Sequence, residues 1–516
     1  MNSLLVGLFI VAGLYLWSKH RKTKSMVYPP GPKPLPVLGN VMDLTARELW
    51  LRATEWARKY GDIVFLHVMG QGLLFLNTSE VAMDLLDKKG SIYSDKPSLV
   101  MAGELCGCEN MVAFTRYGDQ SRRQRKLMQQ ALGASAIRTY QPFLQIQAYD
   151  LMAGILGDPK HHLDYIRKYS GSLVLHVVYG YRVTSKDDKY LMLAEECVDI
   201  LSNRIASGGG IWPVDIFPFL KYLPDSFPGA GFKLKAKEWR AKMQEFVDKP
   251  YENLLEQMRE GSALDCFCTM LLEDMRSKDS VIDPQRDFDI RWTANSMYSA
   301  SLDTTITAVQ HFIACMMLHP EVMKKAQQEI DSVTGGSRLP TFSDRESLPY
   351  VEAVMSEVLR WGVPVPLGLP HRLMEDDVYN GMFIPKGTLV FANIWNILRN
   401  EEIFPDAHAF RPERYLVQVD EVTAKRRDPR NYVFGFGRRK CPGVHLIESS
   451  LWIVMASMLA TFDFEKAKDE KGRPIEPTLQ FENSVFRTPN PFECDIRPRS
   501  EQAIKIVRHA VELEAI

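Results

Sequence analysis

The sequence predicts a mainly α protein with small β-sheets, folded as one large domain behind an N-terminal membrane anchor. Helical patterning begins near Ser79 and dominates the chain from there onward. Residues 291–318 contain no Gly or Pro and are long enough to cross the domain as one central helix. A chain of 516 residues, of which 46% are hydrophobic, can bury a core of that size.

The N-terminus has the charge pattern of an anchor. Residues 2–18 carry no charge, and a basic cluster follows directly at residues 19–24. A cleaved signal peptide has its positive charge before the apolar stretch, whereas here it comes after. The flanks predict a single-pass transmembrane anchor over residues 1–18, with the rest of the chain cytoplasmic. Residues 19–40 form a basic, Pro-rich hinge, and residues 41–516 form the main domain.

Strand patterns are few and short. Two apolar runs within residues 62–78 flank the Gly70-Gln71-Gly72 step and predict a hairpin. Strand-like stretches at residues 389–393 and 486–496 are expected to complete a small sheet. Helices therefore supply most of the predicted structure.

Charge and cysteine usage exclude several classes of protein. The formal net charge of -1 argues against a nucleic-acid binder. The eight cysteines show no zinc-finger spacing, and the two C-x-C pairs have no histidines nearby. Most of the cysteines therefore read as ordinary thiols in a reducing compartment.

One cysteine has a distinct setting. Residues 434–443 read F-G-F-G-R-R-K-C-P-G, and an apolar run at 444–459 follows as a predicted buried helix. This places Cys441 at a helix N-terminus, where backbone N–H groups stabilise a thiolate. Arg439 is placed to pair with an anionic group of the ligand that the sulfur holds. A structural, buried cysteine is the alternative.

The spacing F-x-x-G-x-R-x-C-x-G resembles the haem-binding signature of the cytochrome P450 family. The matching residues are Phe434, Gly437, Arg439, Cys441 and Gly443. The resemblance implies haem b (iron protoporphyrin IX) as the cofactor, with Cys441 as the iron ligand and the other four residues around the haem. A cysteine hydrolase fits less well, because no histidine motif accompanies Cys441.

Two further residues match the family's haem contacts. Arg125, in the basic helical segment 117–132, matches the arginine of the family's W-x-x-x-R pair, whereas Ser121 stands in place of the tryptophan. His371 follows Pro370 at a position where relatives have a propionate ligand. Taken alone, a basic helix face is usually solvated, and an isolated histidine usually has a plain hydrogen-bonding role.

The central helix contains A-S-L-D-T-T at residues 300–305, which resembles the family's A-G-x-D/E-T. The resemblance assigns an acid–alcohol pair: Thr304 binds oxygen or a water through its hydroxyl, and Asp303 relays protons. Ser301 replaces the family's glycine. Taken alone, D-T-T is more often a bent polar helix than a catalytic one. The helix stripe expected to face haem contains Met297, Ala300 and Thr304.

A pair of charged motifs has a structural role in the family. Glu357 and Arg360 match E-x-x-R, and Arg414 lies in F-R-P-E-R-Y. A Glu–Arg pair at this spacing is common on solvated helices. The resemblance instead implies that all three side chains form a buried network behind the haem.

Two segments are expected to border the substrate. Residues 363–372 resemble the segment that crosses above the haem, with Val363, Val365 and Leu367 facing substrate. The Pro-rich stretch 213–228, with Gly208 to Gly210 before it, matches the family's lid over the substrate channel, although a plain surface loop is the alternative. The tip at residues 484–487 would close the pocket.

The family landmarks run in order from residue 28 to about 498, and they look most like fungal microsomal members of secondary metabolism, such as the O-methylsterigmatocystin oxidoreductase group in mushroom-forming fungi. The resemblance implies monooxygenation of an apolar skeleton, with terpenoid favoured and polyketide or indole as options. No flavin or nicotinamide fingerprint is present, so NADPH-derived electrons must come from another protein. The expected donors are NADPH-cytochrome P450 reductase and cytochrome b5, at the endoplasmic reticulum membrane.

Two alternatives stay open. Within the same fold, a desaturase or a ring-rearranging oxidase would use the same cofactor. A non-catalytic haem-binding sensor or carrier belongs to a different class, and Ser121 and Ser301 keep it open because both replace usual family residues.

Overall fold

The computed structural model describes residues 26–45, 47–205, 212–278, 283–482 and 484–514. The predicted anchor at residues 1–18, the first part of the hinge and Gly208 to Gly210 lie outside the described residues.

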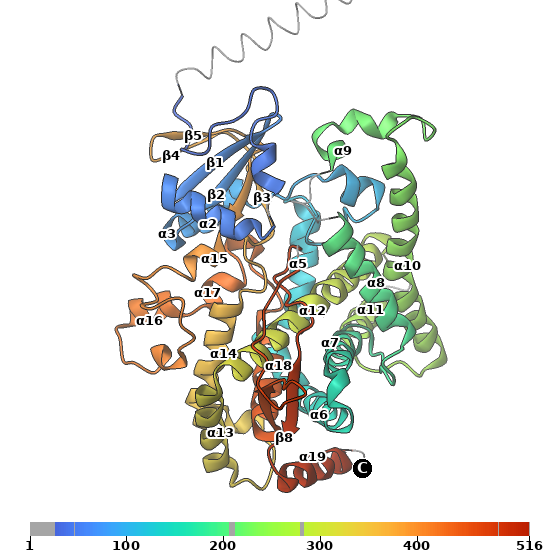
Figure 1. Cartoon of the computed structure of the whole chain (residues 1–516). Coiled ribbons are helices and arrows are strands. Elements are labelled where there is room, and N and C mark those ends of the chain that lie inside the picture. Colours follow the sequence, from blue (N-terminus) through green and yellow to red (C-terminus); the bar gives the residue numbers. More distant parts are fainter. Residues whose placement is uncertain (1–25, 46, 206–211, 279–282, 483, 515–516) are drawn as a thin grey trace, which may run out of the picture.

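The fold is mainly α with small sheets, so the predicted fold class is confirmed (Figure 1). The first half of the chain contains α2 Leu49–Tyr60, α3 Ser79–Ala82, α4 Gly90–Tyr93, α5 Asp119–Leu132, α6 Ala134–Gly157, α7 His162–Tyr179, α8 Lys189–Asp199, α9 Pro213–Ile216 and α10 Gly231–Glu260. The second half contains α11 Phe267–Lys278, α12 Pro284–Leu318, α13 Pro320–Thr334, α14 Pro349–Gly362, α15 Ile394–Ile397, α16 Glu421–Arg427, α17 Arg430–Val433, α18 Val444–Thr461 and α19 Glu501–Glu514.

Helix α12 is the central helix, and α5, α7, α14 and α18 pack against it. It begins at Pro284 rather than at Arg291, because proline is compatible with the first helical position, where its missing N–H has no partner to lose. The Asp283 carboxylate caps the helix by accepting a hydrogen bond from the Gln285 N–H at 3.1 Å. Most of the side chains of α12 are buried, as expected for a helix that crosses the domain.

The main sheet has four strands in the order β1-β2-β6-β3. The predicted hairpin is confirmed as β1 Ile63–Val68 and β2 Gln71–Leu76, with Met69 and Gly70 at the turn. Strand β6, Leu389–Ala392, runs parallel to β2, and the short β3, His371–Arg372, covers its other edge. A separate hairpin joins β4 Asp377–Tyr379 to β5 Met382–Ile384.

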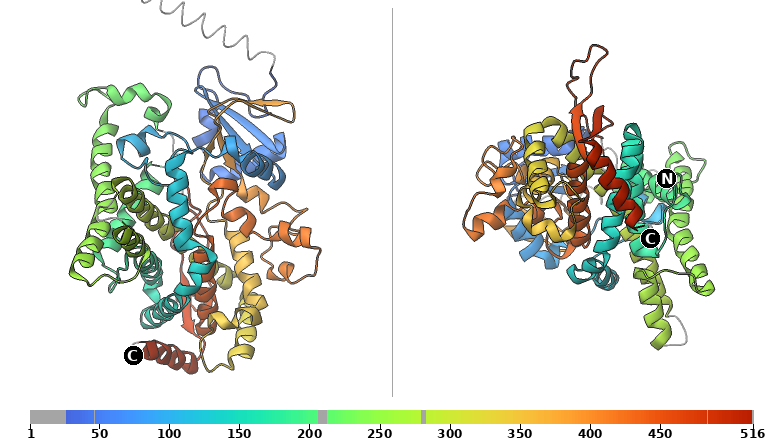
Figure 2. Two further views of the ribbon diagram at one scale, coloured as in Figure 1. Left: turned by 180° about the vertical axis from the view of Figure 1, so that it is seen from behind. Right: turned by 90° about the horizontal axis from the view of Figure 1, so that it is seen from below.

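The predicted strand at residues 486–496 is wrong over most of its length. Strand β8 covers only Cys494–Pro498 and pairs with β7, Phe462–Lys466, in a sheet of its own. Pro489 and Pro491 lack the N–H that a strand ladder needs, so the chain before Cys494 does not form a regular strand. Figure 2 shows the same elements from behind and from below.

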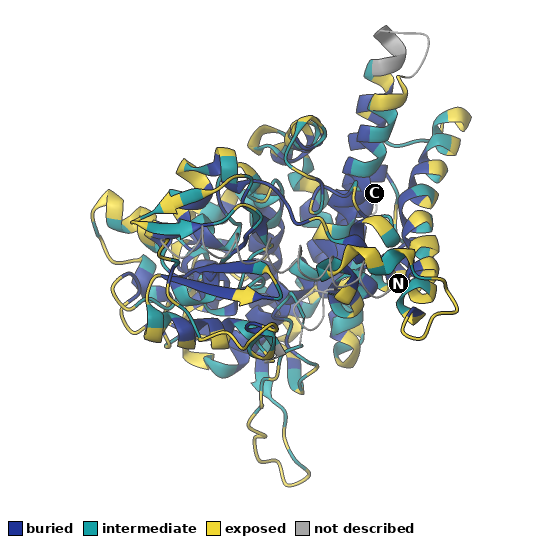
Figure 3. Cartoon of the chain, turned by 90° about the horizontal axis from the view of Figure 1, so that it is seen from above, coloured by how far each residue is buried: buried dark blue, intermediate teal, exposed yellow. Residues whose placement is uncertain are grey.

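The largest hydrophobic core lies between α12, α18 and the helices around them, and Figure 3 shows buried residues at the centre of the molecule with exposed ones on the outer helices. Of the helices that the structure describes, α18 alone is long and apolar enough to cross a membrane. About 72% of that stretch is buried, which is typical of a core helix in a soluble domain.

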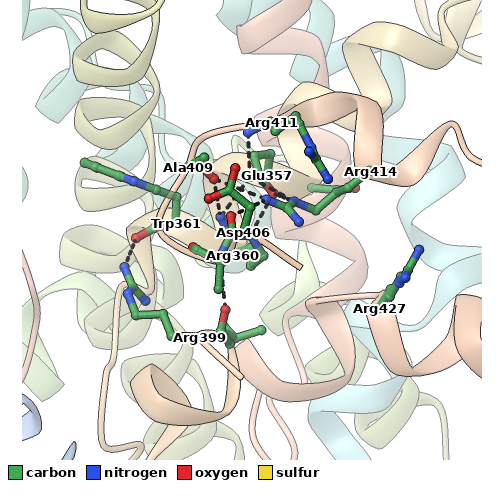
Figure 4. A network of polar contacts seen from close by, with 12 residues as sticks. Glu357, Arg360, Trp361, Arg399, Asp406, Ala409, Arg411, Arg414 and Arg427 are labelled. Atoms are coloured by element: carbon green, nitrogen blue, oxygen red, sulfur yellow. Dashed lines mark hydrogen bonds and ion pairs between the residues drawn. The ribbon is translucent and has the colours of Figure 1, made fainter. Parts of the chain in front are cut away.

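Glu357 and Arg360 of α14 and Arg414 are brought together in the interior (Figure 4). The Arg360 guanidinium donates to both carboxylate oxygens of Glu357 at 2.8 Å, and the Nε of Arg414 donates to them at 3.2 and 3.1 Å. The remaining N–H groups of the two arginines donate to backbone carbonyls, including those of Leu398 and Ala407. One carboxylate therefore holds α14 and the chain from Leu398 to Arg414 in a single arrangement.

This network generates a prediction for stability. The substitution Glu357→Gln removes the charge that compensates Arg360 and Arg414, which are both buried. Leaving buried charge uncompensated costs about 3–5 kcal/mol, so the variant should unfold at much lower urea concentration or fail to accumulate as folded protein.

The matched control is Lys325→Ala, which breaks the partly exposed ion pair between Lys325 and Glu413 at 2.6 Å. Exposed pairs contribute roughly 0–1 kcal/mol, so this variant should resemble the parent. Equal urea midpoints for the two variants would contradict the structural role of Glu357.

Candidate functional site

The loop before α18 presents Cys441 through a tight backbone arrangement. The Cys441 N–H donates to the carbonyl of Phe434 at 2.7 Å. Gly437 has a φ of 53°, and a Cβ at this residue would lie 2.2 Å from the carbonyl oxygen of Leu86. Only glycine allows both that conformation and that approach. The loop is therefore packed directly on the 83–88 segment, which fixes the position of the sulfur.

The thiol of Cys441 has opposing influences on its pKa. Cys441 has exposed surface, but the protein atoms packed around its sulfur still raise the pKa of the thiol, whereas the Gly443 N–H and the charges of Arg125 and Lys440 lower it, and the net direction is upward. A thiol that coordinates a metal loses its proton in spite of such a shift, since the ion's own charge dominates locally. The surroundings of Cys441 thus suit a sulfur that becomes a thiolate on binding iron.

A group of basic side chains lies next to this loop. It contains Lys96, Arg125, His371 and Arg439. The positive charges of Arg439 and Arg125 lower the pKa of the Lys96 amine, and those of Lys96 and Arg439 lower the pKa of His371, in each case after the larger effect of burial. Burying several cations together costs free energy, and anionic groups that bind among them offset this cost.

Each of these side chains is oriented by a backbone carbonyl. Arg439 donates from Nε to Ser94 at 2.8 Å and from Nη2 to Thr115 at 2.8 Å. Arg125 donates to Lys440 at 2.6 Å. The Nδ1 of His371 donates to the Tyr93 carbonyl at 2.7 Å, which leaves its Nε2 for another partner.

Lys96 was not predicted from the sequence. Its ammonium donates to the carbonyls of Leu369 and Pro370 at 3.1 Å, and the residue is only 5% exposed. The preceding Asp95 is held by Arg116 at 2.7 Å, so its charge is already compensated. A buried lysine is recognisable in the structure but not in the sequence, where a lysine before Pro97 gives no sign of burial.

These residues fit haem b. Cys441 would supply the sulfur donor for iron, and Lys96, Arg125 and Arg439 would supply N–H donors for the two propionates, with the ring of His371 beside them. Ser121 lies one turn before Arg125 in α5, and its hydroxyl is buried with no hydrogen-bond partner within the described chain. Arg125 is the one cation that α5 contributes to the described cluster.

The central helix has an unusual opening in its buried surface. Ala300 is exposed and Thr304 is half-buried, although both lie in the middle of α12. Met297, one turn earlier, is buried. The Thr304 hydroxyl donates to the Ala300 carbonyl at 2.9 Å. We interpret the exposed atoms of Ala300 and Thr304 as part of the wall of an internal reaction space.

Ser301 lies away from this wall. It is buried, and its hydroxyl has no hydrogen-bond partner. The backbone carbonyls of Ser301 and Leu302 instead accept hydrogen bonds from the Ser170 hydroxyl of α7 at 3.2 and 3.1 Å. The serine that replaces the family's glycine thus packs between α12 and its neighbours.

The environment of Asp303 favours the protonated form of its carboxyl group. Its carboxylate accepts a hydrogen bond from the Ser202 hydroxyl at 3.3 Å. Burial raises the pKa of Asp303 to about 6, and the nearby carboxylates of Glu482, Asp199 and Glu195 add to the shift while Ser202 opposes it. A carboxyl group of this pKa can both accept and release protons near neutral pH.

The segment after α14 is only partly arranged as predicted. Val365 and Leu367 are half-buried and Leu369 is 46% exposed, but Val363 is fully buried within a core cluster. Val363 therefore contributes to the core and not to a substrate surface in this structure. Its φ of 44° is rare for a β-branched residue, and such backbone strain costs about 1–3 kcal/mol.

The stretch 213–228 contains α9 and the short helix Pro218–Tyr222, followed by a loop. Its aromatic side chains are exposed, with Phe219 at 64% and Phe227 at 50%. The Asp215 carboxylate joins this stretch to the 100–105 segment by accepting from the Met101 N–H at 2.9 Å.

A sulfur donor and a nest of buried cations on this helical framework define a haem-thiolate protein. The chain belongs to the cytochrome P450 family, since the family model "Cytochrome P450" matches residues 29–495. Its relatives include the cytochrome P450 monooxygenase claT of Ampulloclitocybe clavipes, which is 42% identical over 506 residues that cover 97% of each chain. Cytochrome P450 monooxygenase 136 of Postia placenta is 37% identical over 96% of this chain and 92% of the relative.

A tryptamine 4-monooxygenase of Psilocybe cyanescens is 36% identical, over 98% of this chain and all of the relative. Family membership confirms the predicted cytochrome P450 fold and haem b as the cofactor, which the family binds through a cysteine thiolate. The protein is an oxidoreductase of the fungal monooxygenase type.

The site predicts a spectroscopic result. Reduced holoprotein treated with carbon monoxide should show the red-shifted Soret band of a thiolate-ligated haem, and Cys441→Ala should abolish that band. Cys494→Ala is the control, because Cys494 is a half-buried cysteine of β8. A parent spectrum like that of a histidine-ligated globin would contradict the assignment of Cys441.

Proposed function

We propose that the protein inserts one oxygen atom of O2 into an apolar secondary-metabolite skeleton, using electrons from NADPH through a reductase. The observation that carries this proposal is the exposed Ala300–Thr304 wall of α12, with an acid of raised pKa beside it, in a chain that carries the family's cysteine loop. Haem supplies the oxidising chemistry, and the protein supplies orientation, dry walls and protons.

The residues proposed to border the substrate favour an apolar compound. Leu369, Val365 and Leu367 have aliphatic side chains that are exposed or half-buried, and Ala300 is exposed on α12. Such a surface suits a terpenoid, as expected from the sequence, and also a polyketide or an indole. The name of the tryptamine 4-monooxygenase relative supports the indole option.

Asp303 and Thr304 are the proposed proton-handling pair. The Thr304 hydroxyl lies on the exposed side of α12 and can bind oxygen or a water there. Asp303 lies next in the chain on a different helix face, where its hydrogen bond to Ser202 connects it to the 200–205 segment. We assign Asp303 to bring protons from that side and Thr304 to deliver them.

The electron donor is proposed to bind beside Cys441. Exposed cations on α5 and on the cysteine loop are Arg122, Arg123, Lys126 and Arg438, of which Arg122 is paired with Asp119 and Arg123 with Asp289. A cationic surface steers an acidic partner toward itself. This favours NADPH-cytochrome P450 reductase, with cytochrome b5 as a second donor.

Membrane association is proposed from two apolar surfaces at the same end of the molecule, which Figures 1 and 2 both show at the top. One is the segment after the predicted anchor, where Val27, Leu35 and Val37 are exposed. The other is the 213–228 stretch with Phe219, Tyr222 and Phe227 exposed. Exposed apolar patches of this kind favour contact with a lipid surface, such as that of the endoplasmic reticulum.

The anchor proposal predicts the behaviour of a shortened chain. A chain starting at Tyr28 should keep its haem, because the described domain contains every residue of the cation cluster, and should move largely from the membrane to the soluble fraction. The measurement is haem content and sedimentation with microsomes. If the shortened chain fails to bind haem, residues 1–27 belong to the domain and the predicted boundary is incorrect.

Reaction class is tested by reconstitution. The full chain with NADPH-cytochrome P450 reductase in microsomes should convert one member of a panel of tryptamine, sesquiterpene and polyketide compounds into a product carrying one oxygen atom from labelled O2. Loss of two hydrogens without oxygen would indicate a desaturase. NADPH consumption that no compound stimulates would favour the non-catalytic haem protein.

With that substrate, Thr304→Ala should uncouple the reaction while haem content and substrate binding stay near the parent values, because only a hydroxyl and a methyl group are lost. The ratio of hydrogen peroxide to product should rise by about 10-fold or more, as expected for loss of a proton-transfer group.

The matched variant is Ser301→Gly, which removes a buried hydroxyl on the same helix. It should keep its coupling. If Ser301→Gly loses coupling and Thr304→Ala keeps it, the proton path runs through Ser301 and the assignment of Thr304 is incorrect.

A further inference from the structure

A strained turn joins α14 to the segment that the proposed function places beside the substrate. Val363, at the centre of this turn, has φ 44° and ψ 78°, a region that β-branched residues rarely adopt. Such a conformation persists only where neighbouring contacts hold it. The contacts that hold Val363 therefore also determine where the following residues lie.

Arg487, from the loop before β8, bonds to the residues on both sides of Val363. Its backbone N–H donates to the Pro364 carbonyl at 2.9 Å. Its Nη1 donates to the Gly362 carbonyl at 2.8 Å. One residue thus holds the peptide group that enters Val363 and the peptide group that follows Pro364.

The side chain of Arg487 is itself held in place. Its guanidinium carbon lies 3.6 Å from the ring centre of Phe481 and 4.7 Å from that of Trp395, and the residue is 5% exposed. Cations over aromatic faces are attracted by the rings' electron density, which offsets part of the cost of burial. Arg487 is therefore rigid enough to position a neighbour.

Arg487 also contacts the central helix. Its Nη1 lies 2.9 Å from Nε2 of His311. The Nδ1 of His311 donates to the Thr307 carbonyl at 2.8 Å, so Nε2 is the acceptor and Arg487 the donor. A Cβ at Gly362 would lie 2.9 Å from the His311 ring, which shows how closely the turn approaches α12.

We propose that Arg487 is a positioning residue. It sets how far the segment Pro364–Leu369 extends into the substrate site, and thereby the size of substrate that the site accepts. This rests on the proposed function. The segment transmits a shift at Val363 because it is stiff: the Trp395 N–H donates to Pro366 at 3.0 Å, and the Gly368 N–H donates to Val365 at 3.1 Å. Its aliphatic side chains, rather than the guanidinium, contact substrate.

The test measures ligand size against affinity in purified holoprotein. Imidazole is the small probe and a triphenylmethyl imidazole is the bulky one, and each is titrated by the Soret shift that nitrogen ligation causes. In Arg487→Met and Arg487→Lys, the Kd for imidazole should stay at the parent value. The Kd for the bulky probe should change by about fivefold or more in both variants.

Lysine should not rescue the parent ranking, because it keeps the charge but lacks the planar fork that reaches a carbonyl while stacking on rings. Hydrogen exchange of the amides in residues 365–369 should become faster in both variants, since the turn loses its clamp. If Arg487→Met does not fold, Arg487→Lys decides the result.

The control is Arg399→Lys. Arg399 lies over the same Trp395 ring at 3.1 Å and donates to the Trp361 carbonyl at 2.9 Å, but it does not bond to Gly362 or Pro364. This variant should lose thermal stability and keep the parent ratio of the two Kd values. A change in that ratio as large as in Arg487→Lys would overturn the proposal, because general destabilisation would then explain both.

A second pair of probes separates positioning from anion recognition. A phenylimidazole bearing a carboxylate and its methyl ester differ in charge but little in shape. The proposal predicts that the Arg487 variants affect both equally. It is overturned if only the carboxylate probe loses affinity, or if Arg487→Lys keeps the parent size ranking. A parent protein that shows no Soret shift with imidazole would instead contradict the proposed function.

Discussion

In the protein interior the carboxylate of Glu357 pairs with two buried guanidinium groups at once, and the geometry around it depends on that pairing. Arg360 and Arg414 reach past Glu357 to carbonyls of a chain segment that has little regular structure of its own. That segment leads into α17 and then into the cysteine loop. This buried ion-pair network therefore orders a segment that lacks regular secondary structure, and the cysteine loop follows that segment in the chain.

The candidate site also contains buried charge, but there the cations have no anionic partner among the described side chains. Around Glu357 one negative charge lies between two guanidinium groups, whereas Lys96, Arg125 and Arg439 donate to carbonyls and to no carboxylate within the described residues. Burial lowers the pKa of Lys96 well below its usual value, and its cationic neighbours lower it further. The first arrangement stabilises the fold, and the second is suited to an anionic ligand.

Short-range patterns made much of this predictable. The hairpin of β1 and β2, the central helix and the helix after Cys441 follow from periodicity and from the positions of Gly and Pro. The cysteine loop was recognisable because chemistry requires its residues at fixed spacing. Lys96 and Arg487 could not be found in this way, because their roles come from burial and from carbonyls over a hundred residues away in the chain. Val363 was misplaced for a related reason, since a turn with positive φ reverses which side chain faces the core.

The positive charge beside the cysteine loop affects the stability of the protein before haem binds. Until anions enter, Lys96, Arg125 and Arg439 repel one another in a buried setting, so the region around them is less stable in the apoprotein than in the haem-bound protein. A ligand that binds only the folded state stabilises it by mass action. Cells remove proteins in proportion to the fraction that is unfolded. The steady-state amount of this enzyme should therefore follow the supply of haem, and cells starved of iron would degrade it without any dedicated regulator.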